Sequence, residues 1–123
     1  MNNLVDLEKK INSELTTKIN SSFIKYDQIY INVNSSDIIE VITFLKTNNQ
    51  TKFKQLIDIT AVDYPENSKR FKLVYLLLSH EFNLRVILDS FINENEIVPT
   101  LIPLFPSANW MEREVFDMYG VKF

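Results

Sequence analysis

The sequence predicts an α+β fold in which helices pack on a small mixed or antiparallel sheet. Two stretches repeat apolar residues at steps of three and four, which is the spacing of an amphipathic helix. Other stretches alternate apolar and polar residues or are apolar throughout, as strands do. The predicted order is therefore α-β-α-β-β-β, and a last amphipathic stretch after several prolines adds a C-terminal helix.

The first three elements follow from local patterns. The first helix is expected over residues 3–19, with apolar positions at Leu4, Leu7, Ile11, Leu15 and Ile19. Residues 28–34 alternate isoleucine or valine with more polar side chains, which predicts a half-buried strand. The Asn-Ser-Ser-Asp sequence at 34–37 then offers N-cap side chains and an acid for a second helix that runs to about residue 48.

Three consecutive strands are expected next, at residues 53–62, 70–79 and 83–91. Proline and asparagine in residues 64–68 predict the turn between the first two strands, and a tight connection joins the last two. Such short connections make the three strands antiparallel neighbours. Residues 70–79 are apolar on both faces, which predicts a central strand covered on both sides.

The C-terminal part of the chain differs in character. Residues 93–96 are polar, and three prolines, the last of them Pro106, limit the following segment to short helical turns. Ser107 or Asn109 is expected to cap the last helix, and Gly120 is expected to end it. We assign residues 1–92 to the core of the α+β domain, and 93–123 to a proline-interrupted segment and docking helix of the same domain.

The composition excludes several kinds of function. A chain of 123 residues, 46% hydrophobic, fits one domain, and its net charge of −3 without a basic cluster argues against a nucleic-acid partner. With no cysteine and one histidine, it lacks the usual ligands of iron–sulfur clusters and most transition metals, so we expect no cofactor and no metal in it. One glycine cannot build a phosphate-binding loop or a nucleophile turn. No stretch has the pattern of a signal peptide or a membrane span.

Two acidic residues lie in the first of the three consecutive strands. Their spacing puts Asp58 and Asp63 on opposite faces about 17 Å apart, which is too far for shared acid–base catalysis. Asp63 is expected to cap the turn that follows. Asp58 lies inside an apolar strand, so we expect it to be buried and paired with an arginine or with backbone amides. His80 lies in a turn and is expected to be exposed.

The terminal helix carries an unusual mixture of side chains. On a helical wheel Trp110, Arg113, Glu114 and Asp117 share one side, and Met111, Val115, Phe116, Met118 and Tyr119 share the other. Arg113 has the spacing to pair with Asp117 and to lie over the ring of Trp110. Glu112 falls on the apolar side, where a carboxylate needs a basic or amide partner in this chain or across an interface. The helix is either a carboxylate site or a docking element, and the absence of thiols, glycine loops and a workable triad favours docking.

Several blocks in residues 56–123 follow one another in a specific order. Residues 56–65 read Leu-Ile-Asp-Ile-Thr-Ala-Val-Asp-Tyr-Pro, and Arg70-Phe71 and Asn83-Leu84-Arg85 open the next two blocks. The most specific block has Phe-Pro-Ser-Ala-Asn-Trp at 105–110, Glu-Arg-Glu at 112–114 and Asp-Met-Tyr-Gly at 117–120. In this order the blocks resemble the 30-kilodalton subunit family of respiratory complex I, the proton-pumping NADH:quinone oxidoreductase.

The resemblance implies a subunit of the hydrophilic arm of the complex, in the quinone module, next to the quinone-site subunit and the iron–sulfur subunits. The complex is an NADH:ubiquinone reductase that translocates protons. The iron–sulfur clusters, FMN and quinone are expected in partner subunits, with no catalytic site in this chain and only indirect contact with the membrane. The implied docking residues are Trp110, Glu112, Arg113, Glu114, Asp117 and Tyr119, and the implied structural motif is Asp58, Asp63, Arg70 and Arg85.

The sequence departs from the family in two ways. Ile87 stands where family members often carry a basic residue, and the chain stops at Phe123, before the family's His-Pro and Arg-rich segment and its extended tail. We expect a fragment, or a split gene in which a second polypeptide supplies the tail. The N-terminus has no Arg-rich presequence, so we expect an organelle-encoded protein on the matrix side of the mitochondrial inner membrane, or a protein at the cytoplasmic face of a bacterial membrane.

Other functions fit the same residues. The nearest alternative is the equivalent subunit of a membrane-bound hydrogenase or of a plastid-type quinone oxidoreductase. A generic adaptor domain unrelated to respiration is another. A small carboxylate-based enzyme that uses Asp58 or Glu112 with His80 is a third, and it requires those groups to converge on one pocket.

Overall fold

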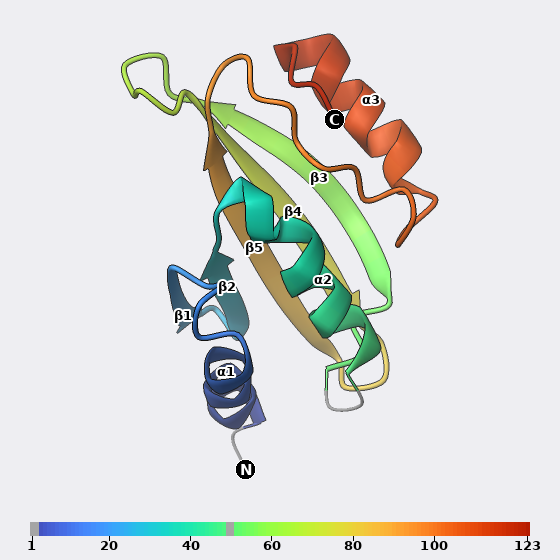
Figure 1. The fold of residues 1–123 in the computed structure, drawn as a ribbon. Helices are drawn as coiled ribbons and strands as arrows, with labels where there is room; N and C mark the ends of the chain where they lie inside the picture. The colour runs from blue at the N-terminus through green and yellow to red at the C-terminus, as the bar shows by residue number, and fades with distance from the viewer. Residues whose placement is uncertain (1–2, 49–50) are drawn as a thin grey trace.

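The computed structural model of the chain describes residues 3–48 and 51–123. In these ranges the elements are α1 (Asn3–Glu14), β1 (Ser21–Lys25), β2 (Gln28–Asn32), the 3₁₀ turn η1 (Ser35–Asp37), α2 (Ile38–Thr47), β3 (Gln55–Asp63), β4 (Phe71–Ser79), β5 (Leu84–Ile92) and α3 (Ala108–Tyr119) (Figure 1). The strands form a sheet in the order β1-β2-β5-β4-β3. Strands β2 and β5 are parallel, whereas the other neighbours are antiparallel. The predicted α+β class, with a mixed sheet and a C-terminal helix, is confirmed.

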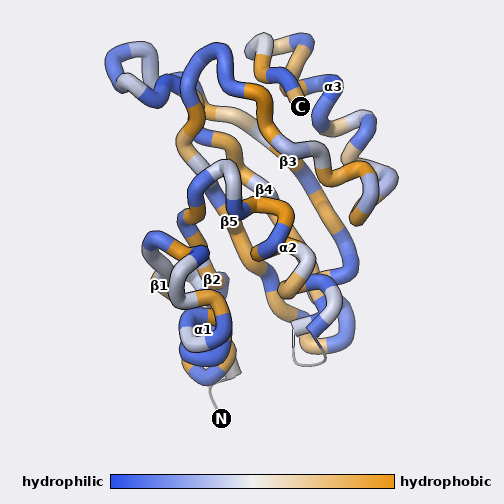
Figure 2. The backbone as a smooth tube through the Cα atoms, in the orientation of Figure 1, coloured by the Kyte–Doolittle hydropathy of each residue, from blue (hydrophilic) through white to orange (hydrophobic). Residues whose placement is uncertain are grey.

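The helices cover one face of the sheet. Ser22 on β1 bonds to side chains of α1, and strand pairing puts it in one row with Tyr75 on β4 and Ile59 on β3. Ile59 in turn lies beside Val115 of α3. Helix α2 buries four apolar residues in the same core as this face. Figure 2 shows hydrophobic residues along the inner strands, while the β3–β4 loop is hydrophilic.

The opposite face of the sheet is open. No helix or strand of the described ranges covers it, and Leu76 and Ile87, which pair across β4 and β5, remain partly exposed on it. The expectation that residues 70–79 are covered on both sides is therefore wrong. Strand β4 lies between β3 and β5. These two strands flank the β4 side chains on the open face, but no helix or strand in the described ranges lies over them.

The hairpin of β1 and β2 was not expected from the sequence. Its turn residues Tyr26 and Asp27 both have positive φ, 53° and 58°. Positive φ at both central residues is the geometry of a type I′ turn, which usually contains asparagine and glycine. The sequence therefore lacks the usual signal for this hairpin.

The helix ends differ from the expected ones. Helix α1 ends at Glu14 rather than near residue 19. Around this end, the hydroxyls of Ser13 and Thr16 donate hydrogen bonds to the backbone carbonyls of Lys10 and Asn12, and such side-chain bonds compete with the backbone bonds of a helix. The Asn-Ser-Ser-Asp sequence provides no side-chain cap for η1 or α2. Asn34 instead accepts a bond from Asn20, and Ser35 bonds to Glu96.

Candidate docking surface

Helix α3 starts and ends at clear local signals. Ser107 occupies the N-cap position but makes no side-chain cap bond, so the predicted cap by Ser107 or Asn109 is wrong. The start is instead held by backbone bonds, in which the amide of Ala108 donates to the carbonyl of Phe105 at 2.9 Å. Gly120 ends the helix with φ 74°, as predicted, because the left-handed conformation suits glycine.

Glu112 is buried, with 5% of its surface exposed. Its carboxylate accepts a bond from the hydroxyl of Thr100 at 2.6 Å and another from the backbone amide of Leu101 at 2.7 Å. The expected partner thus lies in this chain and is an amide together with a hydroxyl. The carboxylate links α3 to the proline-interrupted segment. Glu112 therefore stabilises the position of the helix and is not exposed for contact with a partner.

Tyr75 lies near this buried carboxylate. Burial, and then the negative charge of Glu112, raise the pKa of Tyr75 far above its usual range. Its hydroxyl has no hydrogen-bond partner in the described part of the chain. Tyr75 therefore stays neutral, and its ring serves as part of the core.

The outer side of α3 exposes large apolar side chains. Trp110 is 74% exposed, Met118 66% and Phe116 48%, although Phe116 and Met118 were expected on the apolar side of the helix. Ile97, in the segment before the helix, is 71% exposed. We call these four residues, with Ile102, the docking surface. The sequence signal that could have revealed it is the apolar arc of α3 on the helical wheel, which is too wide to be covered by one edge of a sheet.

The predicted docking residues divide into two groups. Arg113, Glu114 and Asp117 are exposed beside Trp110, but Arg113 makes neither the expected ion pair with Asp117 nor a cation–π contact with Trp110. Tyr119 is turned inward, where its ring packs edge-on against Phe71 at 6.1 Å between centroids. Glu112 and Tyr119 therefore belong to the support of the helix.

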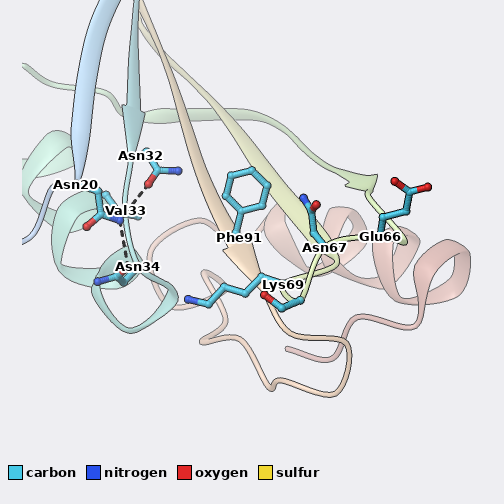
Figure 3. Close-up of a pocket in the computed structure, with 9 residues that line it drawn as sticks. Asn20, Asn32, Val33, Asn34, Glu66, Asn67, Lys69 and Phe91 are labelled. Carbon is cyan, nitrogen blue, oxygen red and sulfur yellow. Dashed lines mark hydrogen bonds between the residues drawn. The ribbon is translucent and has the colours of Figure 1, made fainter.

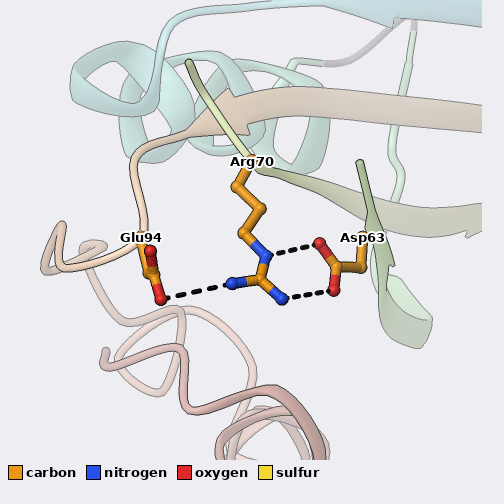
Figure 4. A network of polar contacts seen from close by, with 3 residues as sticks. All are labelled: Asp63, Arg70 and Glu94. Atoms are coloured by element: carbon orange, nitrogen blue, oxygen red, sulfur yellow. Dashed lines mark hydrogen bonds and ion pairs between the residues drawn. The ribbon is translucent and has the colours of Figure 1, made fainter. Parts of the chain in front are cut away.

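A network of ionic bonds closes the β3–β4 hairpin (Figure 4). Arg70 donates to both carboxylate oxygens of Asp63, at 2.7 and 2.9 Å, and to Glu94 at 3.3 Å. Hydrogen bonds from Arg70 hold the pKa of Asp63 below its usual value. Asp63 thus pairs with an arginine across the turn, and the structure brings Asp63 and Arg70 of the predicted motif together.

The other predicted acid, Asp58, is exposed rather than buried. The pairing of β3 with β4 shifts register between Leu56 and Asp58, which is the mark of a β-bulge, and the carboxylate accepts a bond from the next backbone amide at 2.9 Å. It lies on the open face of the sheet, as Arg85 does. The expected bond to an amide is present, but the expected burial is wrong because the bulge re-aims the side chain.

The candidate catalytic groups do not converge. His80 is exposed at the β4–β5 turn and bonds to Gln55. Asp58 faces the open side of the sheet, while Glu112 is buried on the helix side. The hydrogen-bond partners of Asp58 and Glu112 are the Ile59 amide and the Thr100 and Leu101 groups, so in the described ranges His80 bonds to neither acid, as the small-enzyme alternative would require.

A polar hollow of about 510 Å³ lies between β2 and the β3–β4 loop (Figure 3). Asparagine amides and Phe91 line it. Asn20 donates to Asn32 at 3.0 Å and to Asn34 at 3.1 Å, and Asn32 bonds to Asp89. Because these amides bond mainly to one another, we interpret them as cross-links at the end of the sheet.

In residues 3–48 and 51–123, no group of three or more histidine, aspartate or glutamate side chains is arranged to hold a metal ion. None of the helices described is both long enough and apolar enough to cross a membrane.

Comparison with known proteins assigns the family. Residues 31–123 match the family described as "Respiratory-chain NADH dehydrogenase, 30 Kd subunit". The chain belongs to this family. It is 41% identical over 120 residues to a protein of Chelativorans sp. that is named as a subunit of NADH-quinone oxidoreductase, and the match covers 98% of this chain and 60% of that relative. It is 45% identical over 97 residues to "NADH dehydrogenase [ubiquinone] iron-sulfur protein 3, mitochondrial" of Candida albicans, and this match covers 79% of this chain and 35% of that relative.

A solved structure shares the fold. It is part of the membrane-bound sulfane sulfur reductase, "an archaeal respiratory membrane complex", and it superposes with a TM-score of 0.84 at 24% identity over 96% of this chain and 68% of that chain. The chain spans about 60% of the length of the first bacterial relatives.

Proposed function

We propose that this chain is a structural subunit of NADH:quinone oxidoreductase that docks neighbouring subunits and carries no catalytic site or cofactor of its own. Its family membership supports a place in that respiratory complex. The quinone-site and iron–sulfur subunits are the proposed partners, and electrons would pass through those partners. The proposed location is the surface of the membrane that holds the complex, on the matrix side if the source is mitochondrial.

The observation that carries the docking role is the cluster of exposed apolar side chains on and beside α3. Isolated exposed apolar residues are common, but three large ones on a single helix, one of them a tryptophan, are typical of protein interfaces. Beneath this surface, two hydrogen bonds to Glu112 hold the helix against the preceding segment. Groups that are already held in place before binding lose less conformational freedom on association.

The equivalent subunit of another membrane-bound respiratory complex is a second candidate. The fold of the sulfane sulfur reductase supports it, but only at the level of the fold. The sequence relatives are named as NADH dehydrogenase or NADH-quinone oxidoreductase subunits, which favours the first proposal.

The test compares two exposed aromatic residues in the complete protein. Trp110→Ala should weaken association with the complex by about 2 kcal/mol or more, roughly thirtyfold, because tryptophans are frequent interface hot spots. Phe82→Ala changes an aromatic residue at the β4–β5 turn and should leave association unchanged. Native gel electrophoresis of membrane extracts measures the incorporated fraction, and equal incorporation of both variants would refute the role of α3.

A further inference from the structure

A hollow of about 620 Å³ opens beside α3 and shares Ile97 and Phe116 with the docking surface. Asn109, Arg113 and Phe116 line it from one side of the helix, and Ile97 and Lys122 line it from the two chain segments that pair with each other there. The amide of Val98 donates to the carbonyl of Lys122 at 2.8 Å, so this wall is hydrogen-bonded. The hollow has the size of sites that take a large side chain or a short peptide.

The interior of the hollow is apolar. Ile97 and Phe116 contribute large side chains that are 71% and 48% exposed. Covering these side chains would remove apolar surface from water, which favours association. An occupant must therefore bring an apolar side chain of its own.

The charges at the hollow favour an acidic occupant. Neither Arg113 nor Lys122 forms an ion pair with a residue in the described part of the chain. The carboxylate of Glu112 on the inner wall is occupied by the Thr100 hydroxyl and the Leu101 amide. A guanidinium binds a carboxylate with two parallel hydrogen bonds, which adds specificity as well as affinity.

We propose that this hollow binds a segment of a neighbouring subunit in which a carboxylate stands beside a large apolar side chain. The carboxylate bonds to Arg113 with Lys122 nearby, and the apolar side chain packs against Phe116 and Ile97. The proposal rests on the docking function proposed above and specifies the chemistry of the partner.

Photo-crosslinking identifies the occupant. The complete protein carries p-benzoylphenylalanine in place of Phe116, is assembled in its native membranes and is irradiated, and the crosslinked peptides are identified by mass spectrometry. We expect a crosslink to one segment of a neighbouring subunit that contains an aspartate or glutamate. A crosslink within the same chain, to a second copy of it, or to a segment without a carboxylate would overturn the proposal.

Charge reversal tests the carboxylate directly. The double variant Arg113→Glu with Lys122→Glu should lower the incorporated fraction at least about tenfold, because each change replaces attraction by repulsion. Lys54→Glu, an exposed lysine before β3, is the matched control and should incorporate normally. Changing the crosslinked carboxylate to lysine should then restore incorporation of the double variant.

The outcomes separate the two proposals. If the wild-type protein does not migrate with the complex, the docking function fails. If the wild-type protein does, and the double variant incorporates equally well, only the acidic partner is wrong.

Discussion

At the scale of single residues, the buried carboxylate of Glu112 fixes helix α3 against the segment before it. Glu112 lies on a helix side that otherwise packs into the protein, and both of its hydrogen-bond donors come from the segment just before the helix. A buried carboxylate without donors would be costly, so the segment and the helix must keep this relative position. The exposed apolar residues of the segment and of the helix are therefore held in a fixed arrangement.

Replacing Glu112 tests this role. Glu112→Gln keeps the shape but replaces the oxygen that accepts from the Thr100 hydroxyl by an amide group that can only donate, so that the hydroxyl must turn and its charge-assisted bond is lost. We expect the free energy of unfolding to fall by about 1–3 kcal/mol, measured by urea unfolding. Glu114→Gln, exposed two residues away, should change it by less than about 0.5 kcal/mol. Equal stability of both variants would contradict the structural role of the buried carboxylate.

The pair of Asp63 and Arg70 should make stability depend on pH in the acidic range. Because the pKa of Asp63 is lowered in the folded state, its ionised form stabilises the fold above the pKa of the unfolded chain. This stabilisation is lost as the pH falls through the lowered folded-state pKa. The difference in melting temperature between the wild type and Asp63→Asn should thus be constant near neutral pH and shrink in acid. A difference that does not depend on pH would argue against the ionic pair.

At the scale of elements, the β1–β2 hairpin is the least conventional part of the fold. Tyr26 is 78% exposed with positive φ, a conformation that is uncommon for a bulky residue. The pairing of β2 with β5 attaches the hairpin to the rest of the sheet. The packing of the hairpin, rather than its turn sequence, therefore determines its position.

A glycine in this turn should relieve the backbone. Asp27→Gly should raise the free energy of unfolding by roughly 0.5–1 kcal/mol, because glycine adopts positive φ without a steric penalty. The φ of Lys54 is not positive, so Lys54→Gly should lower the free energy of unfolding, because glycine gives the unfolded chain more conformational freedom. Thermal unfolding followed by circular dichroism compares the two, and destabilisation by Asp27→Gly would show that the turn is not strained.

At the scale of the whole molecule, the class, most of the element order and the antiparallel strands β3 to β5 could be predicted from the sequence. These features depend on local periodicity, as in residues 28–34, and on short connections between consecutive strands. The parallel pairing of β2 with β5 could not be predicted, because it joins segments that lie far apart in the chain, such as Ile29 and Val86. The open face of the sheet could not be predicted either, because it depends on all the helices packing against the other face.

The candidate site was predicted in part. The odd place of Glu112 on the helical wheel indicated a basic or amide partner, and the structure provides the backbone amide of Leu101 together with the hydroxyl of Thr100. The exposure of Phe116 and Met118 was missed, because helical periodicity separates apolar from polar sides without telling which apolar residues a sheet can cover. The docking role of the outer side of α3 stays a prediction.

The most direct measurement is the partner list of the complete protein, tagged and isolated from membranes of its source in mild detergent. Native gel electrophoresis separates the complexes, and mass spectrometry identifies the proteins in each band. We expect the protein to migrate with the iron–sulfur and quinone-site subunits, in a band that oxidises NADH with quinone. Migration as a free monomer, apart from that activity, would contradict this expectation.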